Sequence, residues 1–285
     1  MRRLESQSAM EYLMTYGWAI LIIAVVLAVL FQLGVFSGGN FLPHAQAGSC
    51  QVSRTIAGVS LEGQCNGMLP EYVAQFNGAL IGDINKISDA NFPSGTKPIS
   101  IFAWIKSTQD TTYPFIFNYG AYGAAEEDWV LGFYSGQICS DSWTDHRCAG
   151  PLVNNGQWHF VGFTYPGSGQ NTVVYVDGTA YTGTGSGTPA IVIGGTTITD
   201  IGGGTSNNNY TGNIANVQVY NTSLSQSEAS ALYLEGIGGA PVRPQNLTGW
   251  WPLNGNANDY SGNNNNGQLS NAIFSSSWES SYSAP

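Results

Sequence analysis

An all-β sandwich of antiparallel strands, preceded by one transmembrane α-helix, is the architecture that this sequence predicts. One uncharged apolar run lies near the N-terminus, and many short segments rich in β-branched and aromatic residues follow it. Only 9% of the residues are charged and 37 are glycine, which fits an exported β-rich chain. The net charge of −10 would repel phosphate backbones, so we expect no nucleic-acid partner.

The first predicted element is a helix over residues 7–36, which carries no charged side chain between Tyr12 and Phe36. A helix rises about 1.5 Å per residue, so this stretch is long enough to cross an apolar core of roughly 30 Å. Arg2 and Arg3 precede the run and an acidic region follows it. We therefore expect a single-pass membrane protein with a cytoplasmic N-terminus and an extracellular C-terminal domain.

The residues before the apolar run, RRLESQSAME, resemble the signal of archaeal type IV pilins, in which a peptidase cuts ahead of the hydrophobic helix. The resemblance implies a leader over residues 1–6, a mature protein that begins at Gln7, and self-assembly through the helix. Ser6 departs from the family, which more often has glycine or alanine there. Glu11 would pair with the new N-terminal amine of a neighbouring subunit, because an unpaired carboxylate beside an apolar helix is costly. The alternative is a plain membrane anchor with a hydrated Glu11.

Residues 37–68 contain a Gly-, Pro- and Ala-rich stretch and are expected to form a linker. The chain has four cysteines, and an even count outside the membrane favours disulfides. They fall into two local pairs, Cys50 with Cys65 and Cys139 with Cys148, although the sequence alone allows three pairings. A zinc site is the competing use, but no CxxC occurs and the histidines are scattered.

Three sequons fit a glycosylated exterior, with their asparagines at Asn209, Asn221 and Asn246. Such triplets also arise by chance in a chain so rich in Asn and Thr. The sequence does not decide which of the three are used.

From Tyr72 onward the pattern is one of short strands bounded by Gly, Asn or Pro. Apolar residues recur with period two, as in 99–105, which is typical of antiparallel strands with one buried face. One helix is expected over Ser223–Glu235, where Ser225 and Glu228 form a capping box and Gly236 supplies the stop. The expected strands are VAQFNG (73–78), 99–107, PFIFNYG (114–120), WVLGFYSG (129–136), WHFVGFTY (158–165), TVVYVDG (172–178) and IANVQVY (214–220).

The order of these segments resembles the laminin G-like, concanavalin A-like jelly roll over residues 69–238. The residues that carry the resemblance are FNG (76–78), ISIFAWIK (99–106), GQWHFVGFTYPGSGQNTVVYVDGT (156–179) and IANVQVYNTSLSQSEASALYLEG (214–236). We expect Asp177 and Gly178 to form a hairpin turn, and Trp158, Phe160 and Phe163 to pack in the core and at its rim.

Within the C-terminal segment, residues 239–285, the stretch 247–278 resembles the opening of such a domain but stands at its end. In one interpretation the sandwich is circularly permuted, so that 249–253 and 267–274 return as its missing edge strands. In the other they add to a sheet of a neighbouring subunit. The preceding linker is short, so we favour closure within the chain.

In the same segment the family resemblance implies a structural calcium loop at Asp259, Ser261 and Asn263, because calcium prefers hard oxygen donors. The acidic partner usual in the family is Asn216 here, which removes a charge. A simple Asn- and Gly-rich turn is the alternative. Calcium is thus a possible cofactor, and no other is expected.

The candidate ligand-binding site is the loop closed by Cys139 and Cys148. It offers an aromatic ring for stacking on a sugar together with planar hydrogen-bonding groups, from Asp141, Trp143, Asp145, His146 and Arg147. The alternative is a stapled surface loop without a ligand.

Catalysis finds little support in the sequence. The E-x-D-x-E row of hydrolytic relatives is missing, and the adjacent Glu126, Glu127 and Asp128 are expected to form a solvated loop. We therefore expect a pilin-like surface protein that is not an enzyme and displays its domain for adhesion or for recognition of glycans or surface proteins. A structural filament or envelope subunit is the first alternative, and a glycan-active enzyme the second.

Overall fold

The structure is a computed structural model, and it describes fourteen parts of the chain. These are residues 16, 19–28, 51–56, 59–64, 69–78, 84–85, 87–110, 113–121, 128–142, 146–167, 170–183, 199–203, 208–279 and 282–285. The chain divides into two compact units, Met1–His44 and Ala45–Pro285.

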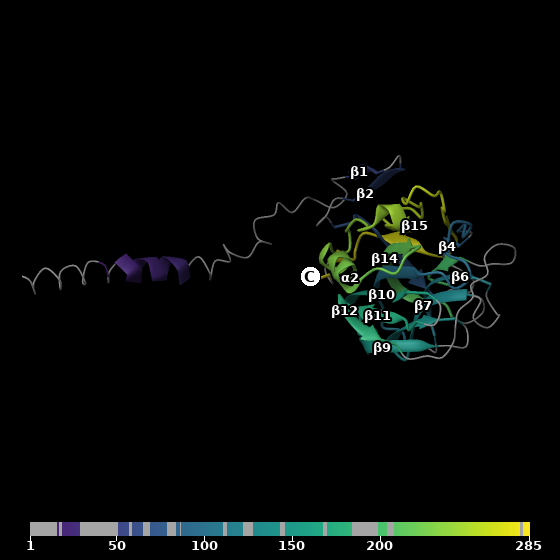
Figure 1. Ribbon diagram of the computed structural model, residues 1–285, viewed down its shortest axis with the longest axis horizontal. Coiled ribbons are helices and arrows are strands. Elements are labelled where there is room, and N and C mark those ends of the chain that lie inside the picture. Colours follow the sequence, from purple (N-terminus) through teal and green to yellow (C-terminus); the bar gives the residue numbers. More distant parts are fainter. Residues whose placement is uncertain are drawn as a thin grey trace, which may run out of the picture. The chain divides into compact units, whose positions relative to one another are not determined.

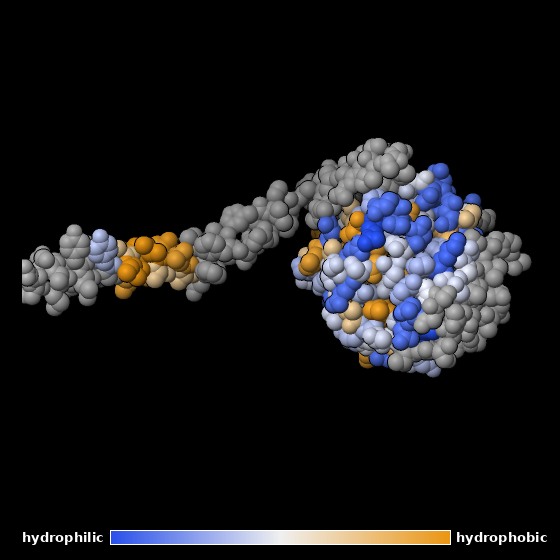
Figure 2. All heavy atoms as spheres, in the orientation of Figure 1, coloured by the Kyte–Doolittle hydropathy of each residue, from blue (hydrophilic) through white to orange (hydrophobic). Residues whose placement is uncertain are grey.

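The first unit contains a short helix over residues 19–28 (Figure 1). Its side chains are exposed and mostly apolar, among them Ile20, Leu21 and Ile22, and Figure 2 shows them in orange. Within the described residues no helix has both the length and the apolar character needed to cross a membrane. The leader, Gln7, Glu11 and most of the expected span over 7–36 lie outside the described residues, so spanning, cleavage and assembly stay predictions.

A two-stranded hairpin lies in the segment that was expected to be a linker. Strands β1 (Gln51–Ile56) and β2 (Val59–Gln64) pair antiparallel, with Gln51 opposite Gln64. The β-branched residues on both sides of an Ala-Gly pair are the signal that could have indicated it. Cys50 and Cys65 lie outside the described residues, and their disulfide stays a prediction.

The rest of the second unit forms two antiparallel sheets, which confirms the all-β sandwich (Figure 1). Among the described residues the first sheet has eight strands in the order β12-β11-β10-β5-β14-β3-β17, and β15 also pairs with β14. They are β3 (Val73–Asn77), β5 (Ile99–Lys106), β10 (Trp158–Tyr165), β11 (Val173–Val176), β12 (Thr179–Thr182), β14 (Thr211–Tyr220), β15 (Leu247–Trp251) and β17 (Ile273–Ser275).

The second sheet has seven strands within the described part of the chain, in the order β16-β4-β13-β6-β7-β8-β9. They are β4 (Ile84–Asn85), β6 (Phe115–Gly120), β7 (Asp128–Tyr134), β8 (Gln137–Asp141), β9 (Arg147–Leu152), β13 (Asp200–Ile201) and β16 (Gln268–Leu269). Strands β16 and β9 are the two edges of this sheet. The candidate site lies near the β9 edge.

The central strand β5 is buried on both faces, whereas the period-two pattern predicts one buried face. Ile101 and Ile105 belong to the main core, and Phe102 and Trp104 belong to a second cluster. That cluster includes Leu232 of the helix α2 (Gln226–Leu234) and residues of the C-terminal segment, which together cover the outer face of the first sheet. A single strand cannot reveal this cover, because the covering residues come from elsewhere in the sequence.

Helix α2 confirms the predicted capping. The Ser225 side chain accepts a hydrogen bond from the Glu228 backbone N–H, and the Glu228 side chain accepts one from the Ser225 backbone N–H. Gly236 follows the helix with φ of +77°, a left-handed conformation that favours glycine. These local signals were sufficient because capping depends on residues close in sequence.

The C-terminal segment closes both sheets of its own chain. Strand β15 pairs with β14, β17 pairs with β3, and β16 pairs with β4. Strands β3 and β15 share one edge of β14, β3 at Thr211–Ile214 and β15 at Val217–Tyr220. The stretch 267–274, expected as one strand, contributes to two strands on different sheets, because the chain crosses between the sheets there.

Asn216 lies in a β-bulge of β14 and joins three parts of the chain through side-chain hydrogen bonds. Its φ is +51°, and its side chain is buried. Its Nδ2 donates to Gly239 O at 2.9 Å, and its Oδ1 accepts from Gln218 Nε2 at 3.0 Å and from Trp250 Nε1 at 2.8 Å. Asparagine suits the site because it tolerates the left-handed region and can both donate and accept.

Replacing Asn216 with alanine should lower the free energy of unfolding by about 2 to 4 kcal/mol. The change leaves buried partners such as the Trp250 indole N–H unpaired, at a cost of about 1 to 3 kcal/mol each, and puts alanine in an unfavourable backbone region. Urea unfolding followed by tryptophan fluorescence measures the difference. Asn258→Ala, at an exposed position, is the matched control and should change stability by less than about 0.5 kcal/mol. Equal midpoints for the two variants would show that Asn216 has no such role.

Candidate functional site

The candidate site lies on the outer face of the seven-stranded sheet, where β7, β8 and β9 run side by side. Val130 pairs with Asp141, and Cys139 pairs with Cys148. Opposed residues of a sheet point to one face, as do alternate residues along a strand, so Asp128 joins these four. Val130, Cys139 and Cys148 form a small apolar cluster separate from the main core.

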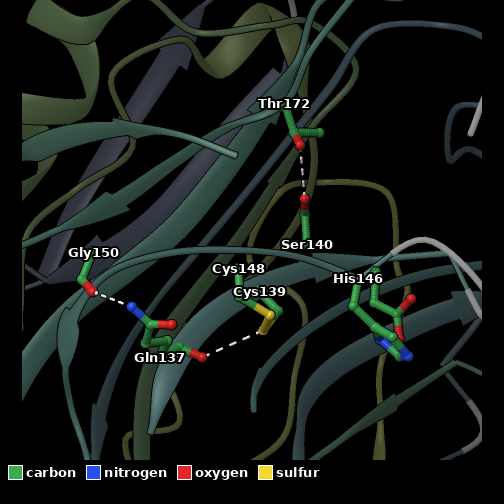
Figure 3. The surroundings of a disulfide bond; sticks show 8 residues. Gln137, Cys139, Ser140, His146, Cys148, Gly150 and Thr172 are labelled. Atoms are coloured by element: carbon green, nitrogen blue, oxygen red, sulfur yellow. Dashed lines mark hydrogen bonds and ion pairs between the residues drawn. A yellow bond between two sulfur atoms is a disulfide. The ribbon is translucent and has the colours of Figure 1, made fainter. Parts of the chain in front are cut away.

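A disulfide between Cys139 and Cys148 joins β8 to the edge strand β9 (Figure 3). It confirms the predicted pairing for these two cysteines. The bond closes the loop that carries the predicted ligand residues and holds its two ends in register.

Replacing both Cys139 and Cys148 with alanine should lower the free energy of unfolding by about 2 to 3 kcal/mol. The disulfide closes a short loop, and cross-links of this kind stabilise mainly by restricting the unfolded chain. Thermal unfolding of the wild type and the double variant, each with and without reductant, measures the effect. In the double variant this disulfide is already missing, so reductant cannot act through it, and the variant shows any effect of reductant elsewhere in the chain. A midpoint unchanged by the double replacement would contradict the expectation.

Asp141 and His146 form the polar pair of the site. The His146 Nδ1 lies 2.9 Å from Asp141 Oδ2, and the two side chains are 49% and 3% exposed. Burial raises the pKa of the Asp141 carboxyl, while His146 and the Tyr113 hydroxyl oppose that rise. The pair therefore presents an exposed imidazole that is oriented by a buried carboxylate.

Two tyrosines complete the site, and sequence reasoning missed both. The Tyr134 ring is stacked with the His146 ring at 6.2 Å and 19°, and Tyr134 is 50% exposed. Tyr113 is buried and meets the His146 ring edge-on at 5.1 Å. The alternation Asp128, Val130, Tyr134 along one face of β7 is the signal that could have placed Tyr134 here.

Asp128 corrects the expectation of a solvated acidic loop. It is the first residue of β7 and is only 1% exposed, so it is a buried part of the sheet and not of a solvated loop. Neither of its carboxylate oxygens has a hydrogen-bond partner within the described residues. Burial, and then the nearby charge of Asp141, raise the pKa of Asp128 to about 7. Glu126 and Glu127 lie outside the described residues.

A further acid extends this face. Asp200 of β13 pairs with Asn118 of β6, which pairs with Val130, so Asp200 lies in one cross-strand row with Asp141. Burial raises the pKa of Asp200 to about 7 as well. Perturbed carboxyl groups gathered on one face are typical of functional sites, although buried structural acids show the same shifts.

The structure brings only part of the predicted ligand set together. Trp143 and Asp145 lie outside the described residues, and their roles stay predictions. Arg147 pairs with Ser140, so it has the opposite orientation to Cys148, and it is buried with its Nη1 3.5 Å from Gln170 O. The Ser140 hydroxyl meets Thr172 on that same side at 2.9 Å (Figure 3). Arg147 is therefore not on the face of Asp141 and His146.

The predicted calcium loop is organised by hydrogen bonds. Asp259 Oδ1 accepts from the backbone N–H groups of Trp250 and Ser261, and its Oδ2 accepts from the Ser261 hydroxyl and the Asn265 N–H. Asn263 donates through Nδ2 to Leu247 O and Thr248 O. The carboxylate lone pairs are thus already used, so these residues fit a hydrogen-bonded turn better than a calcium ion. Among the described residues no group of three or more His, Cys, Asp or Glu could hold a metal ion.

The sequon asparagines lie next to the ends of β14 and β15. Asn221 directly follows β14 and is exposed, and Asn246 ends a short 3₁₀ turn (Pro244–Asn246) before β15. Asn209 precedes β14 and is buried.

Three solved structures illustrate what the chain resembles. A candidate carbohydrate binding protein from Bacteroides ovatus matches with a TM-score of 0.55 at 15% identity, over 72% of this chain and 60% of that one. A SAP-like pentraxin from Limulus polyphemus matches with a TM-score of 0.42 at 15% identity, over 57% and 81%. Domain 4 of an arabinanase from Geobacillus stearothermophilus, in complex with arabinotriose, matches with a TM-score of 0.40 at 16% identity, over 66% and 85%.

At these identities the solved structures show the fold alone, and the chain spans less than two thirds of the Bacteroides protein. None of the curated proteins matches the chain. A laminin G-type family model, described as the concanavalin A-like lectin/glucanases superfamily, matches residues 80–230, which is more than half of the sequence. The two-sheet topology agrees with that match, and the chain therefore belongs to the concanavalin A-like lectin/glucanases superfamily.

Proposed function

We propose that this protein displays its laminin G-like domain at the cell surface to recognise glycans or glycan-bearing proteins. The observation that carries the proposal is the exposed pair of rings, Tyr134 and His146, beside the buried Asp141 carboxylate. Sugars are bound by such a combination, because their C–H faces pack on aromatic rings while their hydroxyls bond to planar polar groups. The Bacteroides structure, described as a candidate carbohydrate binding protein, supports the same class of ligand.

The experiment is a glycan array probed with the full chain, followed by affinity measurements on any glycan retained. Tyr134→Ala should weaken binding about 2- to 13-fold, since an aromatic contact is worth about 0.5 to 1.5 kcal/mol. His146→Ala should weaken it as well, because it removes both the stacked ring and the partner of Asp141.

Leu234→Ala is the matched control, because Leu234 is exposed on α2, which covers the other sheet. It should leave the affinity unchanged. Retention of no glycan, or equal affinities for Tyr134→Ala and the control, would contradict glycan recognition at this site.

The proposal includes a membrane anchor or a pilin-like filament built from the N-terminal helix. The exposed apolar side chains over residues 19–28 support it, because such a surface needs lipid or protein cover. A label on the second unit, viewed by electron microscopy of whole cells, tests the assembly. Filaments support a pilin-like subunit, and dispersed surface label supports a plain anchor.

Glycan hydrolysis is a second candidate, favoured by one observation. A carboxyl with a pKa near 7 beside a second carboxyl resembles the acid and base pair of glycosidases. We nevertheless propose a binding module, because the sequence lacks the carboxylate row of hydrolytic relatives. Incubation of the full chain with each retained glycan should release no new reducing ends, and release that Asp128→Asn abolishes would establish an enzyme.

A further inference from the structure

We propose that Asn221 is the one acceptor of an N-linked glycan in the folded protein, and that the fold excludes Asn209 and Asn246. All three lie in Asn-x-Ser/Thr triplets, so the sequence treats them alike. Their surroundings differ in three respects: exposure of the asparagine, engagement of its amide nitrogen, and access to the hydroxyl two residues later. The inference does not depend on the proposed function.

Asn209 is excluded by burial. It is only 8% exposed, and the next residue of its triplet, Tyr210, is fully buried in the main core. The backbone oxygen of Asn209 accepts a hydrogen bond from Gln109 Nε2 at 2.8 Å, and the last residue of the triplet, Thr211, is the first residue of β14. A glycosyl-transferring enzyme could reach this amide only after the start of β14 had separated from the core.

Asn246 and Asn221 are hydrogen-bonded to each other, and the bond distinguishes them. Asn246 Nδ2 donates to Asn221 Oδ1 at 2.9 Å, and the Asn221 N–H donates to Asn246 O at 2.9 Å. The amide nitrogen of Asn246 is therefore directed at its neighbour. Only the oxygen of the exposed Asn221 side chain takes part in this bond, so the bond does not engage the Asn221 amide nitrogen.

The third residue of the triplet also separates Asn221 from Asn246. Thr248, which belongs to the Asn246 triplet, is buried in β15, and its hydroxyl donates to Val219 O at 3.1 Å. Ser223, which belongs to the Asn221 triplet, lies half-exposed in the loop between β14 and α2. Only the Asn221 triplet thus offers its amide and its hydroxyl on one accessible turn.

Strand β5 holds that turn through the side chain of Ser100. The Ser100 hydroxyl donates to Thr222 O at 2.7 Å and accepts from the Leu224 N–H at 2.8 Å. The turn is thereby presented in one conformation, with the Asn221 side chain in solvent. A glycan there would lie by the first sheet, whereas the candidate ligand site lies on the second sheet.

The donor would be an oligosaccharide linked to a lipid through pyrophosphate. The Asn221 Nδ2 forms a bond to C1 of the first sugar while the bond from C1 to the pyrophosphate oxygen breaks. The lipid pyrophosphate leaves with that electron pair, and one amide proton is lost to a base of the transferring enzyme. The product amide keeps one N–H and its carbonyl oxygen, so the bond from Asn246 can persist.

The test is glycopeptide mass spectrometry of the folded full chain after reaction with an oligosaccharyltransferase and its lipid-pyrophosphate-linked glycan. We expect one glycan per chain, on the peptide that contains Asn221. Ser223→Ala should abolish the modification while keeping Asn221 and its bond to Asn246. Thr211→Ala and Asn246→Gln, which remove the other two triplets, are the matched controls and should leave the glycan in place.

The same reaction on the chemically unfolded, reduced chain shows whether the fold makes the choice. The Asn209 and Asn246 peptides should be modified there, because their burial and pairing are lost. The proposal is overturned if a folded chain carries glycan at Asn209 or Asn246, if Ser223→Ala stays glycosylated, or if the folded chain accepts none while the unfolded one does.

Discussion

A chain that lacks residues 247–285 should fail to fold. The deletion removes β15, β16 and β17, which pair with β14, β4 and β3 of the same chain. It also removes large core side chains, among them Trp251 and Leu253 from the main core and Trp250 and Trp278 from the second cluster. Loss of one buried tryptophan side chain costs about 3 to 5 kcal/mol, and whole domains are stable by only about 5 to 15 kcal/mol.

Circular dichroism, size-exclusion chromatography and limited proteolysis of the truncated chain check this expectation. We expect no cooperative thermal transition, rapid digestion and aggregation, because the loss leaves new sheet edges unpaired. Deletion of the exposed residues 283–285 is the matched control and should preserve the transition. A truncated chain that melts cooperatively as a monomer would mean that these strands are not needed for the sandwich.

Helices and strands whose formation depends on residues close together in the sequence could be predicted from it. The capping box at Ser225 and Glu228 depends on residues three apart, and strand β10 follows from its aromatic and β-branched composition. The closure by β15 could also be inferred, because the GWW segment resembles part of the family and the linker before it is short. The division of 267–274 between two sheets could not, because the position where the chain crosses depends on packing.

The candidate site was predictable only in part, for a similar reason. Cys139, Cys148, Asp141 and His146 are close in sequence, so one loop could be singled out. Tyr113 reaches the site from the segment before β6, and only the three-dimensional fold places it beside His146. Asp128 looked like part of a charged loop, because its burial comes from the sheet rather than from its neighbours in sequence.

The stability of the protein should fall as the pH rises from about 4 to about 7, and Asp128→Asn should remove part of that fall. Burial and the charge of Asp141 raise the pKa of Asp128 from 3.8 to about 7 in the folded protein. Between these values the unfolded chain has released the proton and the folded chain retains it, so raising the pH favours unfolding. Above about pH 7 the Asp128 carboxyl is ionised in both the folded and the unfolded chain, and its effect on the free energy of unfolding no longer changes with pH. Below about pH 3.8 it is protonated in both, and this effect vanishes.

A shift of this size corresponds to an upper limit of about 4 kcal/mol for one group, since one pKa unit is worth about 1.4 kcal/mol. We expect the ionisation of Asp128 to lower the free energy of unfolding by about 2 to 4 kcal/mol between pH 4 and pH 8. Urea unfolding of the wild type and Asp128→Asn at pH 4 and pH 8 measures the effect. The asparagine resembles the protonated acid in shape, so the variant should gain stability relative to the wild type by that amount between the two pH values.

Asp110→Asn, at an exposed carboxylate, is the matched control, and its difference from the wild type should be nearly the same at both pH values. Asp141→Asn provides a second check, because it removes the charge that adds to the effect of burial on Asp128. In that variant the pKa of Asp128 should move back toward its ordinary value, and a further Asp128→Asn change should have a smaller pH dependence. A wild-type protein with equal stability at pH 4 and pH 8, unaltered by Asp128→Asn, would mean that Asp128 is hydrated rather than buried on the sheet face.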